Sequence, residues 1–423
     1  MTRVDALLSH AGLTRRGGSL YLGGVRLSEI ATQVGTPTYV YNLEVIRARY
    51  RALDEALAPI PHRICFAVKA NANLAVLRTL VSLGAGADIV SGGELERALA
   101  AGFPAEHIVF SGVGKSDEEL EAALAAGIGH IHVESAAELA ALGRMAEGHH
   151  RSVALGIRVN PDVTADTHPY IATGRGGIKF GVPVDQVLPL AREIAAHPLL
   201  RLDTLAMHIG SQILDSRPYR EGVLRLMELA SACREAGITT LTALDIGGGL
   251  GIQYRDETPL EPVTLLDAVL PAVRSSGFEL ALEPGRYLAG PAGILLTEVR
   301  SRKHSGGKDL AIVDAGMNDL VRPSHYSAYH EIVELEASGR AAAPVDIVGP
   351  VCETGDFLAL DRTLPLVERG DRLAVLGAGA YGFVMSSNYN SRPRAAEVVV
   401  DGTHWRIARA RETFDDLLRA EDR

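Results

Sequence analysis

Between residues 63 and 284, short apolar runs alternate with longer segments in which apolar side chains recur every three or four residues. A short apolar run bounded by turn residues predicts a strand buried on both faces, and the helical spacing predicts an amphipathic helix. The pattern predicts eight strands, at 64–69, 87–90, 108–111, 130–133, 154–159, 204–209, 243–247 and 279–283.

Most of these strands are separated by one helix-length segment, for example 74–83, 93–101, 117–126 and 136–146, and a further amphipathic helix is expected at 43–57. Strands that alternate with helices pair in parallel, and eight such units fit a closed (β/α)8 barrel. An open doubly wound sheet is the alternative. The glycines at 247–249 follow the seventh strand and not the first, which argues against that alternative. We therefore expect an α/β fold with a barrel over residues 43–288.

The pattern changes on both sides of this region. Residues 289–423 carry short alternating apolar segments separated by Gly, Pro and Asp, which predicts antiparallel strands at 294–299, 310–313, 345–348, 372–376 and 396–400. Residues 1–42 hold two β-like pieces, at 19–22 and 38–41. We expect residues 1–42 and 289–423 to form one antiparallel β-rich domain into which the barrel is inserted.

The composition narrows the class of protein. A chain of 423 residues suits roughly two domains. A net charge of −10 argues against a general nucleic-acid binder or an anionic-membrane binder. No apolar run approaches the roughly 20 residues that span a bilayer, and residues 1–18 lack the apolar core of a secretory signal. We expect a cytoplasmic protein without nucleic-acid or membrane partners.

The chain has three cysteines, Cys65, Cys233 and Cys352, and no Cys-x-x-Cys pair. So few thiols, in an odd number, indicate a reducing compartment. We expect no structural zinc and no other metal site.

The candidate chemistry follows the predicted strands. Barrel enzymes build their sites at the carboxyl ends of the strands. Lys69 ends the first strand, Asp88 lies in the second and His208 lies near the end of the sixth. Glycines at 247–251 follow the seventh strand, and the segment 283–286 ends the eighth. These five features are expected on one rim.

Lys69 and the glycine loop together indicate a cofactor. A lysine that loses hydration at the mouth of an apolar barrel is more often neutral, and a neutral amine attacks carbonyl groups. The alternative is a lysine that ends a strand and points into water. Backbone N–H groups of a glycine loop bind phosphate, although glycines also serve tight turns. An aldehyde for Lys69 and a phosphate for the loop point to pyridoxal 5′-phosphate.

Two further residues suit that cofactor. Glu283 beside the pyridine nitrogen would keep the nitrogen protonated, and its alternative role is a salt bridge to Arg286. His208 would stack on the ring, and its alternative role is that of a hydrogen-bonded core histidine.

The sequence resembles the diaminopimelate decarboxylases, pyridoxal-phosphate enzymes of the alanine-racemase-like fold group. In the barrel, the motifs that carry the resemblance are FAVKAN (66–71), GADIVSGGEL (86–95), HIGSQI (208–213), DIGGGLGI (245–252) and EPGR (283–286). Outside the barrel they are DAGMNDLVRPSHYSAYH (314–330), VGPVCETGDFLA (348–359) and GAGAYGFVMSSNYNSRPRAAEVVVDG (377–402).

The resemblance implies decarboxylation of meso-2,6-diaminopimelate to L-lysine and CO2, the last step of lysine biosynthesis. It implies that Lys69 binds the cofactor covalently and that Cys352 donates a proton to the substrate carbon. Both subunits of a homodimer would build each site, with Cys352 and Glu353 supplied by the second subunit. The implied cofactor-binding residues are Lys69, Asp88, His208, Ser211, Gly248, Glu283, Gly285, Arg286 and Tyr381. The implied substrate-binding residues are Arg286, Arg322 and Tyr326 for the distal carboxylate, Glu353 for the distal amino group, and Tyr381.

Other functions stay open at this point. A decarboxylase for ornithine, arginine or carboxynorspermidine shares the barrel motifs, but Arg286 and Arg322 suit a distal carboxylate better than a distal cation. A racemase would need a second base opposite Lys69, and a non-catalytic pyridoxal-phosphate carrier would not need the long β domain. The sequence departs from the family at two places. Thr354 stands where the family commonly has Ser. The segment 173–180, which covers the site in the family, is rich in glycine where the family often has more polar side chains.

Overall fold

The computed structural model describes residues 2–163 and 179–422. The chain forms two compact units. One comprises Met1–Ala48, Gln253–Glu257 and Leu288–Arg423, and the other comprises Arg49–Ile252 and Thr258–Tyr287. Of the predicted 173–180 segment, residues 173–178 lie outside the described part of the chain.

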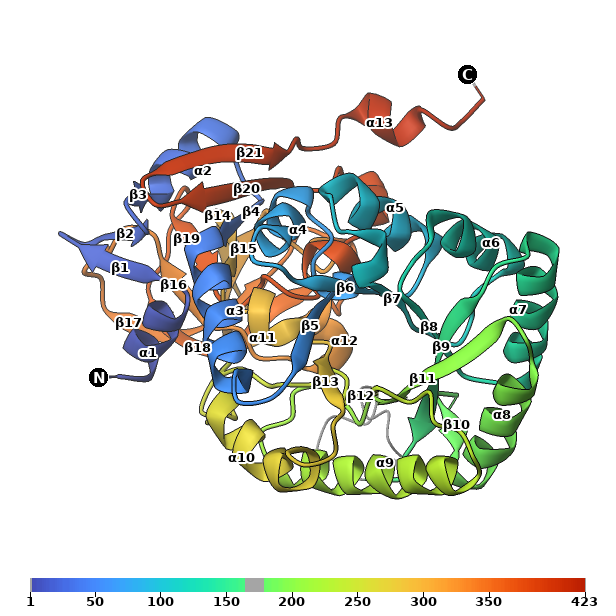
Figure 1. The fold of residues 1–423 in the computed structure, drawn as a ribbon. Helices are drawn as coiled ribbons and strands as arrows, with labels where there is room; N and C mark the ends of the chain where they lie inside the picture. Colours follow the sequence, from blue (N-terminus) through green and yellow to red (C-terminus); the bar gives the residue numbers. More distant parts are fainter. Residues whose placement is uncertain (1, 164–178, 423) are drawn as a thin grey trace. The chain divides into compact units, whose positions relative to one another are not determined.

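The second unit is a closed parallel barrel, with the helices outside the strands (Figure 1). The strands follow the order of the chain, and β13 pairs with β5 to close the ring. All eight predicted strands are confirmed. They are β5 (His62–Ala67), β6 (Gly86–Ile89), β7 (Ile108–Phe110), β8 (His130–Val133), β9 (Val153–Asn160), β11 (Leu200–Met207), β12 (Ala243–Asp245) and β13 (Glu279–Leu282). A two-residue strand, β10 (Val182–Pro183), adds to β9.

The barrel helices begin and end at residues that satisfy free backbone groups. The side chains of Ser91, Ser116 and Ser135 each accept a hydrogen bond from the N–H three residues later. Gly102 and Gly127 end two helices with φ of 96° and 72°, which a residue without Cβ adopts freely. The helices are α3 (Leu43–Leu57), α4 (Leu74–Val81), α5 (Gly92–Ala101), α6 (Asp117–Ala126), α7 (Ala136–His149), α8 (Val184–Ala196), α9 (Arg217–Glu235) and α10 (Pro262–Val273).

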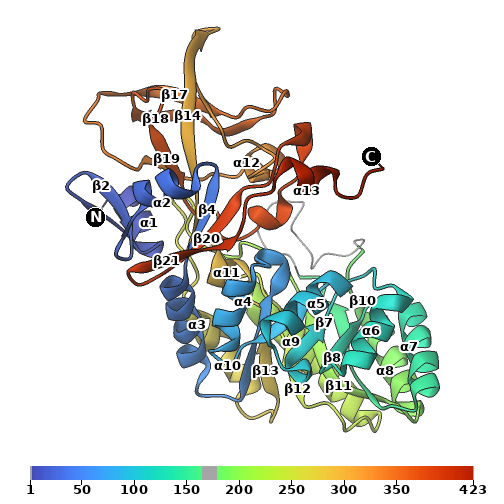
Figure 2. The same cartoon turned by 90° about the horizontal axis from the view of Figure 1, so that it is seen from above.

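The first unit is rich in strands drawn from both ends of the chain. Its main sheet contains β4 (Thr38–Asn42), β14 (Gly293–Ser305), β15 (Lys308–Val313), β16 (Ile332–Glu334), β17 (Ala342–Val348), β18 (Phe357–Pro365), β19 (Arg372–Val375), β20 (Ala396–Asp401) and β21 (His404–Arg409). The far end of the long strand β14 is exposed and projects from the sheet (Figure 2).

The expected β-rich second domain is confirmed, and its largely antiparallel sheet also contains two parallel pairs. Most pairs are antiparallel, but β4 runs parallel to β20, and β15 runs parallel to β17. An alternating apolar pattern places side chains on the two faces of a strand, and it carries no information about the direction of the neighbouring strand.

The amino-terminal segment contains two helices that the β-like pattern did not predict, α1 (Arg3–His10) and α2 (Leu27–Val34), beside a small sheet of β1 (Leu13–Arg16), β2 (Ser19–Leu22) and β3 (Val25–Arg26). Each helix has only eight residues, and helices of that length depend on tertiary packing. Leu27 and Ile30 of α2 are fully buried in the same core as Leu20, Val40 and Ile294.

Three shorter helices are α11 (Arg286–Ala289), α12 (Arg322–Tyr326) and α13 (Phe414–Leu418). Among the described residues, no helix has both the length and the apolar character that a membrane span requires.

Candidate active site

A cavity of about 350 Å³ lies at the carboxyl ends of the barrel strands. Its lining includes Lys69, Ser111, His132, Arg158, His208 and Glu283. The polar side chains come from the ends of six different strands, because parallel strands bring all their carboxyl ends to one rim.

Lys69 lies in a short 3-10 turn, Val68–Ala70, directly after β5. Its Nζ is 2.6 Å from Oδ2 of Asp88, which is fully buried in β6. The other oxygen of Asp88 has no hydrogen-bond partner in the described part of the chain. The amine of this cavity-lining lysine is therefore bonded to a buried carboxylate, and the carboxylate keeps capacity for one more donor.

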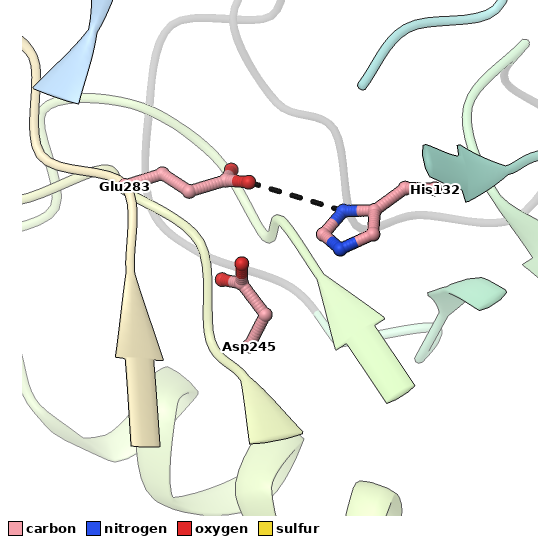
Figure 3. A group of neighbouring side chains, drawn as sticks. All are labelled: His132, Asp245 and Glu283. Atoms are coloured by element: carbon pink, nitrogen blue, oxygen red, sulfur yellow. Dashed lines mark ion pairs between the residues drawn. The ribbon is translucent and has the colours of Figure 1, made fainter. Parts of the chain in front are cut away.

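Glu283 belongs to a buried cluster with His132 and Asp245, whose ligand atoms all lie within 4.8 Å of one another (Figure 3). His132 Nδ1 lies 3.9 Å from Oε1 of Glu283. Desolvation, with Asp245 and Asp88 nearby, raises the pKa of Glu283 well above its ordinary value, and desolvation also raises the pKa of Asp245. Burial lowers the pKa of His132 well below its ordinary value. Glu283 therefore favours its neutral, protonated form, and His132 favours its neutral, unprotonated form.

Three ligand atoms this close match the spacing of a metal site, but the surrounding charge does not suit a cation. Lys69 and Arg158 line the same cavity as Glu283. A carboxyl group with a raised pKa must also lose its proton before it binds a metal. We interpret Glu283 as the proton-holding group of this cluster.

His208 is positioned by the glycine loop. The backbone N–H of Gly248 donates to its Nδ1 at 3.1 Å, so the ring proton of the neutral imidazole lies on Nε2. Desolvation, followed by the charges of Arg158 and Lys69, lowers the pKa of His208 well below its usual value. The imidazole is therefore an uncharged flat group at the cavity wall.

The glycine loop and the turn after β13 lie against each other. The N–H of Glu283 donates to the carbonyl of Gly247 at 2.9 Å. A Cβ on Gly248 would lie 2.2 Å from the carbonyl oxygen of Glu283, so only glycine fits there. A Cβ on Gly285 would lie 2.8 Å from the Cβ of Ala70. Both positions require glycine, because the backbone of Glu283 lies against Gly248 and the Cβ of Ala70 lies against Gly285.

Arg286 and Ser211 also meet in the barrel unit. The buried Arg286 donates from Nη2 to the Ser211 hydroxyl at 3.0 Å. This bond joins the turn after β13 to the loop after β11, so two of the expected cofactor-binding residues lie together.

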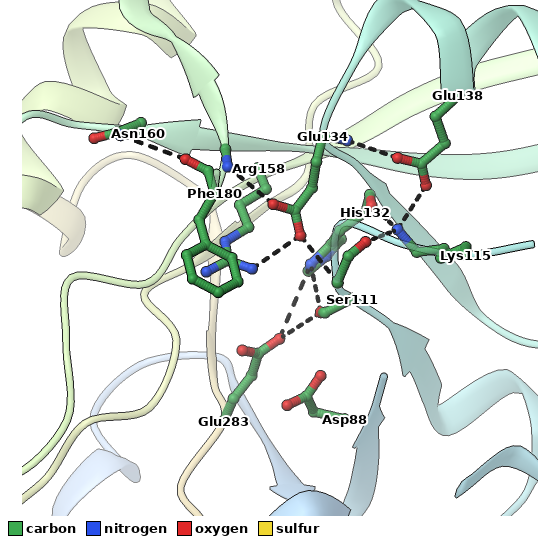
Figure 4. Close-up of polar contacts among 12 residues, drawn as sticks. Asp88, Ser111, Lys115, His132, Glu134, Glu138, Arg158, Asn160, Phe180 and Glu283 are labelled. Atoms are coloured by element: carbon green, nitrogen blue, oxygen red, sulfur yellow. Dashed lines mark hydrogen bonds and ion pairs between the residues drawn. The ribbon is translucent and has the colours of Figure 1, made fainter. Parts of the chain in front are cut away.

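Arg158 is fixed by a network of hydrogen bonds across three loops (Figure 4). Glu134 accepts from Arg158 Nη1 at 2.9 Å and from the N–H groups of Gly112 and Gly181 at 3.0 and 2.8 Å. The Arg158 guanidinium also lies over the Phe180 ring, 4.9 Å from its centroid. The network holds a cation at the cavity with little freedom to move.

The β-rich unit holds its own group of expected residues. Arg322 is buried, donates from Nη1 to His330 Nε2 at 2.8 Å, and lies over the Tyr254 ring at 4.6 Å. His330 Nδ1 donates to the Leu376 carbonyl, which leaves Nε2 as an acceptor. Tyr326 lies one helical turn after Arg322 on α12, so the two residues share a helix face.

Cys352 and Glu353 lie in an exposed turn of the same unit. The backbone N–H of Cys352 donates to Asn390 Oδ1 at 2.8 Å, and the Cys352 side chain is free and exposed. A hydrogen bond with Glu353 raises the pKa of Tyr389. An inert buried cysteine, the alternative for this position, does not describe Cys352, although it describes Cys65 and Cys233.

Tyr381 adopts φ of 57°, the left-handed region that residues with a side chain seldom occupy. Strained backbone of this kind persists where the surroundings hold it, often at functional sites. The next residue, Gly382, admits no Cβ, because one would lie 2.5 Å from the Ala378 carbonyl oxygen.

Four cavity or cluster residues were not predicted: Ser111, His132, Arg158 and Asp245. Each lies at or near the carboxyl end of a predicted strand. The rim rule that selected Lys69 and His208 would have found Ser111, His132 and Arg158, had it been applied to every polar residue in the last two positions of a predicted strand. Asp245 would still have been missed, because it ends the observed strand β12 but lies two residues before the predicted end at 247.

Comparison with known proteins agrees with this arrangement. Residues 43–290 match the model of the pyridoxal-dependent decarboxylase family, pyridoxal binding domain. The chain is 49% identical over 407 residues to a diaminopimelate decarboxylase of Pseudomonas fluorescens, covering 96% of this chain and 97% of that relative. It is 48% identical over 410 residues to the Aquifex aeolicus diaminopimelate decarboxylase, covering 96% of each.

A solved structure of Helicobacter pylori diaminopimelate decarboxylase complexed with L-lysine has a TM-score of 0.91. It is 39% identical in sequence, and the match covers 93% of this chain and 99% of that one. The resemblance seen in the motifs therefore extends over both units, and the chain belongs to the diaminopimelate decarboxylase family of pyridoxal-dependent decarboxylases.

Proposed function

We propose that this chain decarboxylates meso-2,6-diaminopimelate to L-lysine and CO2 with pyridoxal 5′-phosphate as cofactor. The observation that carries the proposal is the barrel cavity, in which Lys69, a proton-holding Glu283 and an uncharged His208 line one space. The near full-length similarity to diaminopimelate decarboxylases, including the β-rich unit, supports the choice of substrate.

The cavity residues fit this cofactor. Asp88 has a buried oxygen without a partner among the described residues, beside the amine that would bind the aldehyde. Gly248, Gly285 and Ser211 would hold the phosphate, with Arg286 bonded to Ser211. When bound, pyridoxal phosphate accepts the electron pair that CO2 leaves behind.

The chain's own groups prepare that step. Glu283 has a raised pKa, so it holds a proton that it would share with the ring nitrogen of the bound cofactor. The neutral imidazole of His208 offers a flat face without a competing positive charge. The fixed guanidinium of Arg158 adds a cation to the same wall.

Residues of the β-rich unit, together with Arg286 of the barrel unit, would supply substrate recognition. Arg322, Tyr326 and Arg286 would bind the distal carboxylate, Glu353 would bind the distal amino group, and Tyr381 would contact both substrate and cofactor. The exposed thiol of Cys352 would return a proton to the substrate carbon, since a thiol has a pKa near enough to neutrality for that transfer. These roles require a homodimer with shared sites, and we place the enzyme in the cytoplasm.

The substrate is tested by incubating the purified protein and pyridoxal phosphate with meso-diaminopimelate, and by measuring CO2 and L-lysine. We expect both products in equal amounts. Ornithine and arginine should give little CO2, because a distal cation would meet the guanidinium of Arg322. Faster release of CO2 from either of these amino acids would assign the enzyme to the alternative substrate class.

Glu283→Gln is expected to bind the cofactor but to lower kcat by about a hundredfold or more, because glutamine cannot protonate the ring nitrogen. The measurement combines the cofactor absorption spectrum with the rate of lysine formation. Glu279→Gln is the matched control, since Glu279 begins the same strand and pairs with Arg63 at the other end of the barrel. Full activity of Glu283→Gln would remove Glu283 from the chemistry.

A further inference from the structure

A second cavity, of about 360 Å³, lies entirely within the β-rich unit. Its charged lining consists of Arg300, Arg392, Arg411, Asp314 and Asp319. None of these five residues has a role in the proposed decarboxylation. Their hydrogen bonds show which charges are already satisfied.

Asp314 and Arg300 satisfy each other. Oδ2 of Asp314 accepts from Arg300 Nη2 at 2.8 Å and from the Thr36 hydroxyl at 2.6 Å. Its Oδ1 accepts from the Thr297 hydroxyl and from the N–H of Glu298 at 2.7 and 2.9 Å. This carboxylate has no oxygen left for the other two arginines.

Arg392 and Arg411 keep unpaired charges. Among residues 2–163 and 179–422, no carboxylate lies within ion-pair distance of either guanidinium. Arg392 donates to the Asp314 carbonyl at 3.0 Å, and Arg411 donates to the Pro37 carbonyl at 2.7 Å and the Thr38 hydroxyl at 3.1 Å. Neutral acceptors therefore orient two guanidinium groups at the cavity without neutralising them.

Asp319 completes the lining. It is 1% exposed, and its Oδ2 accepts from the N–H of Gly316 at 3.0 Å. Its Oδ1 has no hydrogen-bond partner in the part of the chain that the structure describes. Desolvation raises the pKa of Asp319 to about 7, helped by Asp314 and opposed by Arg392 and Arg411. Near neutral pH, a large fraction of this carboxyl group carries a proton and can donate it in a hydrogen bond.

We propose that this cavity binds one small oxyanion, either a tetrahedral one such as inorganic phosphate or a small dicarboxylate. Two oriented guanidinium groups match the geometry of such anions, and the protonated Asp319 adds an O–H donor. The proposal goes beyond the decarboxylation, because it requires neither the barrel nor the substrate.

The bound anion would act on the segment that carries Cys352. Pro350 lines the cavity two residues before Cys352. Arg392 lies two residues after Asn390, which holds the backbone of Cys352 through the 2.8 Å bond. An anion that contacts Arg392 therefore steadies the turn of the proposed proton donor.

The affinity for the anion depends on pH with a definite sign. As the pH rises through about 7, Asp319 ionises, loses its donor and repels the anion. The other groups that face it are Asp314, Arg392 and Arg411, together with the Tyr39 hydroxyl, which donates to the Asp319 carbonyl oxygen. For sulfate, a tetrahedral anion whose own charge does not change in this range, affinity is therefore expected to fall between pH 6 and pH 8, by about tenfold for a one-proton coupling.

The test is calorimetric titration of the pyridoxal-phosphate-loaded, full-length protein with inorganic phosphate in chloride buffer. Loading the cofactor keeps the added phosphate out of the barrel's glycine loop. We expect one site per chain. Arg392→Gln and Arg411→Gln should each weaken binding by about tenfold or more, because each removes a charge-assisted bidentate contact. Arg406→Gln, an exposed arginine on β21, is the matched control and should bind like wild type.

A parallel titration with malonate distinguishes the two kinds of oxyanion. If only phosphate binds, the ligand is a tetrahedral anion. If only malonate binds, the ligand is a dicarboxylate. If each of the two anions binds, the cavity is a general oxyanion site. Absence of binding by either anion at about 10 mM, where even weak sites fill, overturns the proposal. So does binding that neither arginine substitution weakens.

Asp319→Asn provides a second variant that preserves shape. The amide can still accept from Gly316 and always offers a donor, so binding at pH 8 should strengthen and the pH dependence should disappear. An unchanged pH dependence in this variant would contradict the assigned role of Asp319. Cofactor attachment to Lys69 measured in parallel keeps the two proposals separate, because loss of the anion withdraws support only from the Cys352 turn and leaves the Lys69 cavity of the barrel as it is.

Discussion

Lys69→Ala is expected to leave a folded protein with lysine formation lowered by about a thousandfold or more, because the amine holds the cofactor in position for every turnover. Lys69 is the cavity amine, and its Nζ bonds to the buried Asp88. The wild-type protein should absorb at about 420 nm with the cofactor attached, and the variant should lose that band. Lys303→Ala, an exposed lysine on β14, is the matched control.

Reduction with borohydride tests chemically whether Lys69 is the residue that binds the cofactor. Reduction of the loaded wild-type protein should fix the cofactor to one peptide, and mass spectrometry should place it on Lys69. A label on Lys303 or on any other lysine would contradict the assignment of Lys69 as the cofactor-binding residue, whatever the activity of Lys69→Ala.

The second large effect concerns Cys352 and the shared site. Homodimers of Lys69→Ala and of Cys352→Ala should each be nearly inactive. If each site takes Lys69 from one subunit and Cys352 from the other, mixed dimers contain one intact site of two. Random pairing of equal amounts then restores about a quarter of wild-type activity. The alanine at position 352 keeps the backbone bond to Asn390, so the turn itself is preserved.

The control for that mixing experiment uses two changes in the same unit. Lys69 and Glu283 both line the barrel cavity. Mixed dimers of Lys69→Ala with Glu283→Gln therefore contain no intact site, and activity should not return. A site built within one chain predicts no recovery in either mixture, so failure of the first mixture, with subunit exchange shown by mass spectrometry, would refute the shared site.

Much of the barrel was predictable because its signal is local. Each strand is an apolar run, each helix has apolar spacing near 3.6 residues, and serine caps mark several helix starts. The rim rule then placed Lys69 and His208 at one end of the barrel without any knowledge of distances. The β-rich region was predicted as strands, but α1 and α2 were missed, since short helices draw their stability from distant core residues such as Val40 and Ile294.

The identities of the residues determined which side chains could do chemistry, and only the tertiary structure decided their protonation and their partners. Glu283 and Asp245 lie 38 positions apart, yet desolvation in the shared interior raises the pKa of both, and the charge of Asp245 raises the pKa of Glu283 further. The direction in which strands pair, as between β4 and β20, also depends on contacts between distant segments. The same holds for the unpaired charges of Arg392 and Arg411. Burial and long-range contact set local electric fields and hydrogen-bond partners, and a linear pattern carries neither.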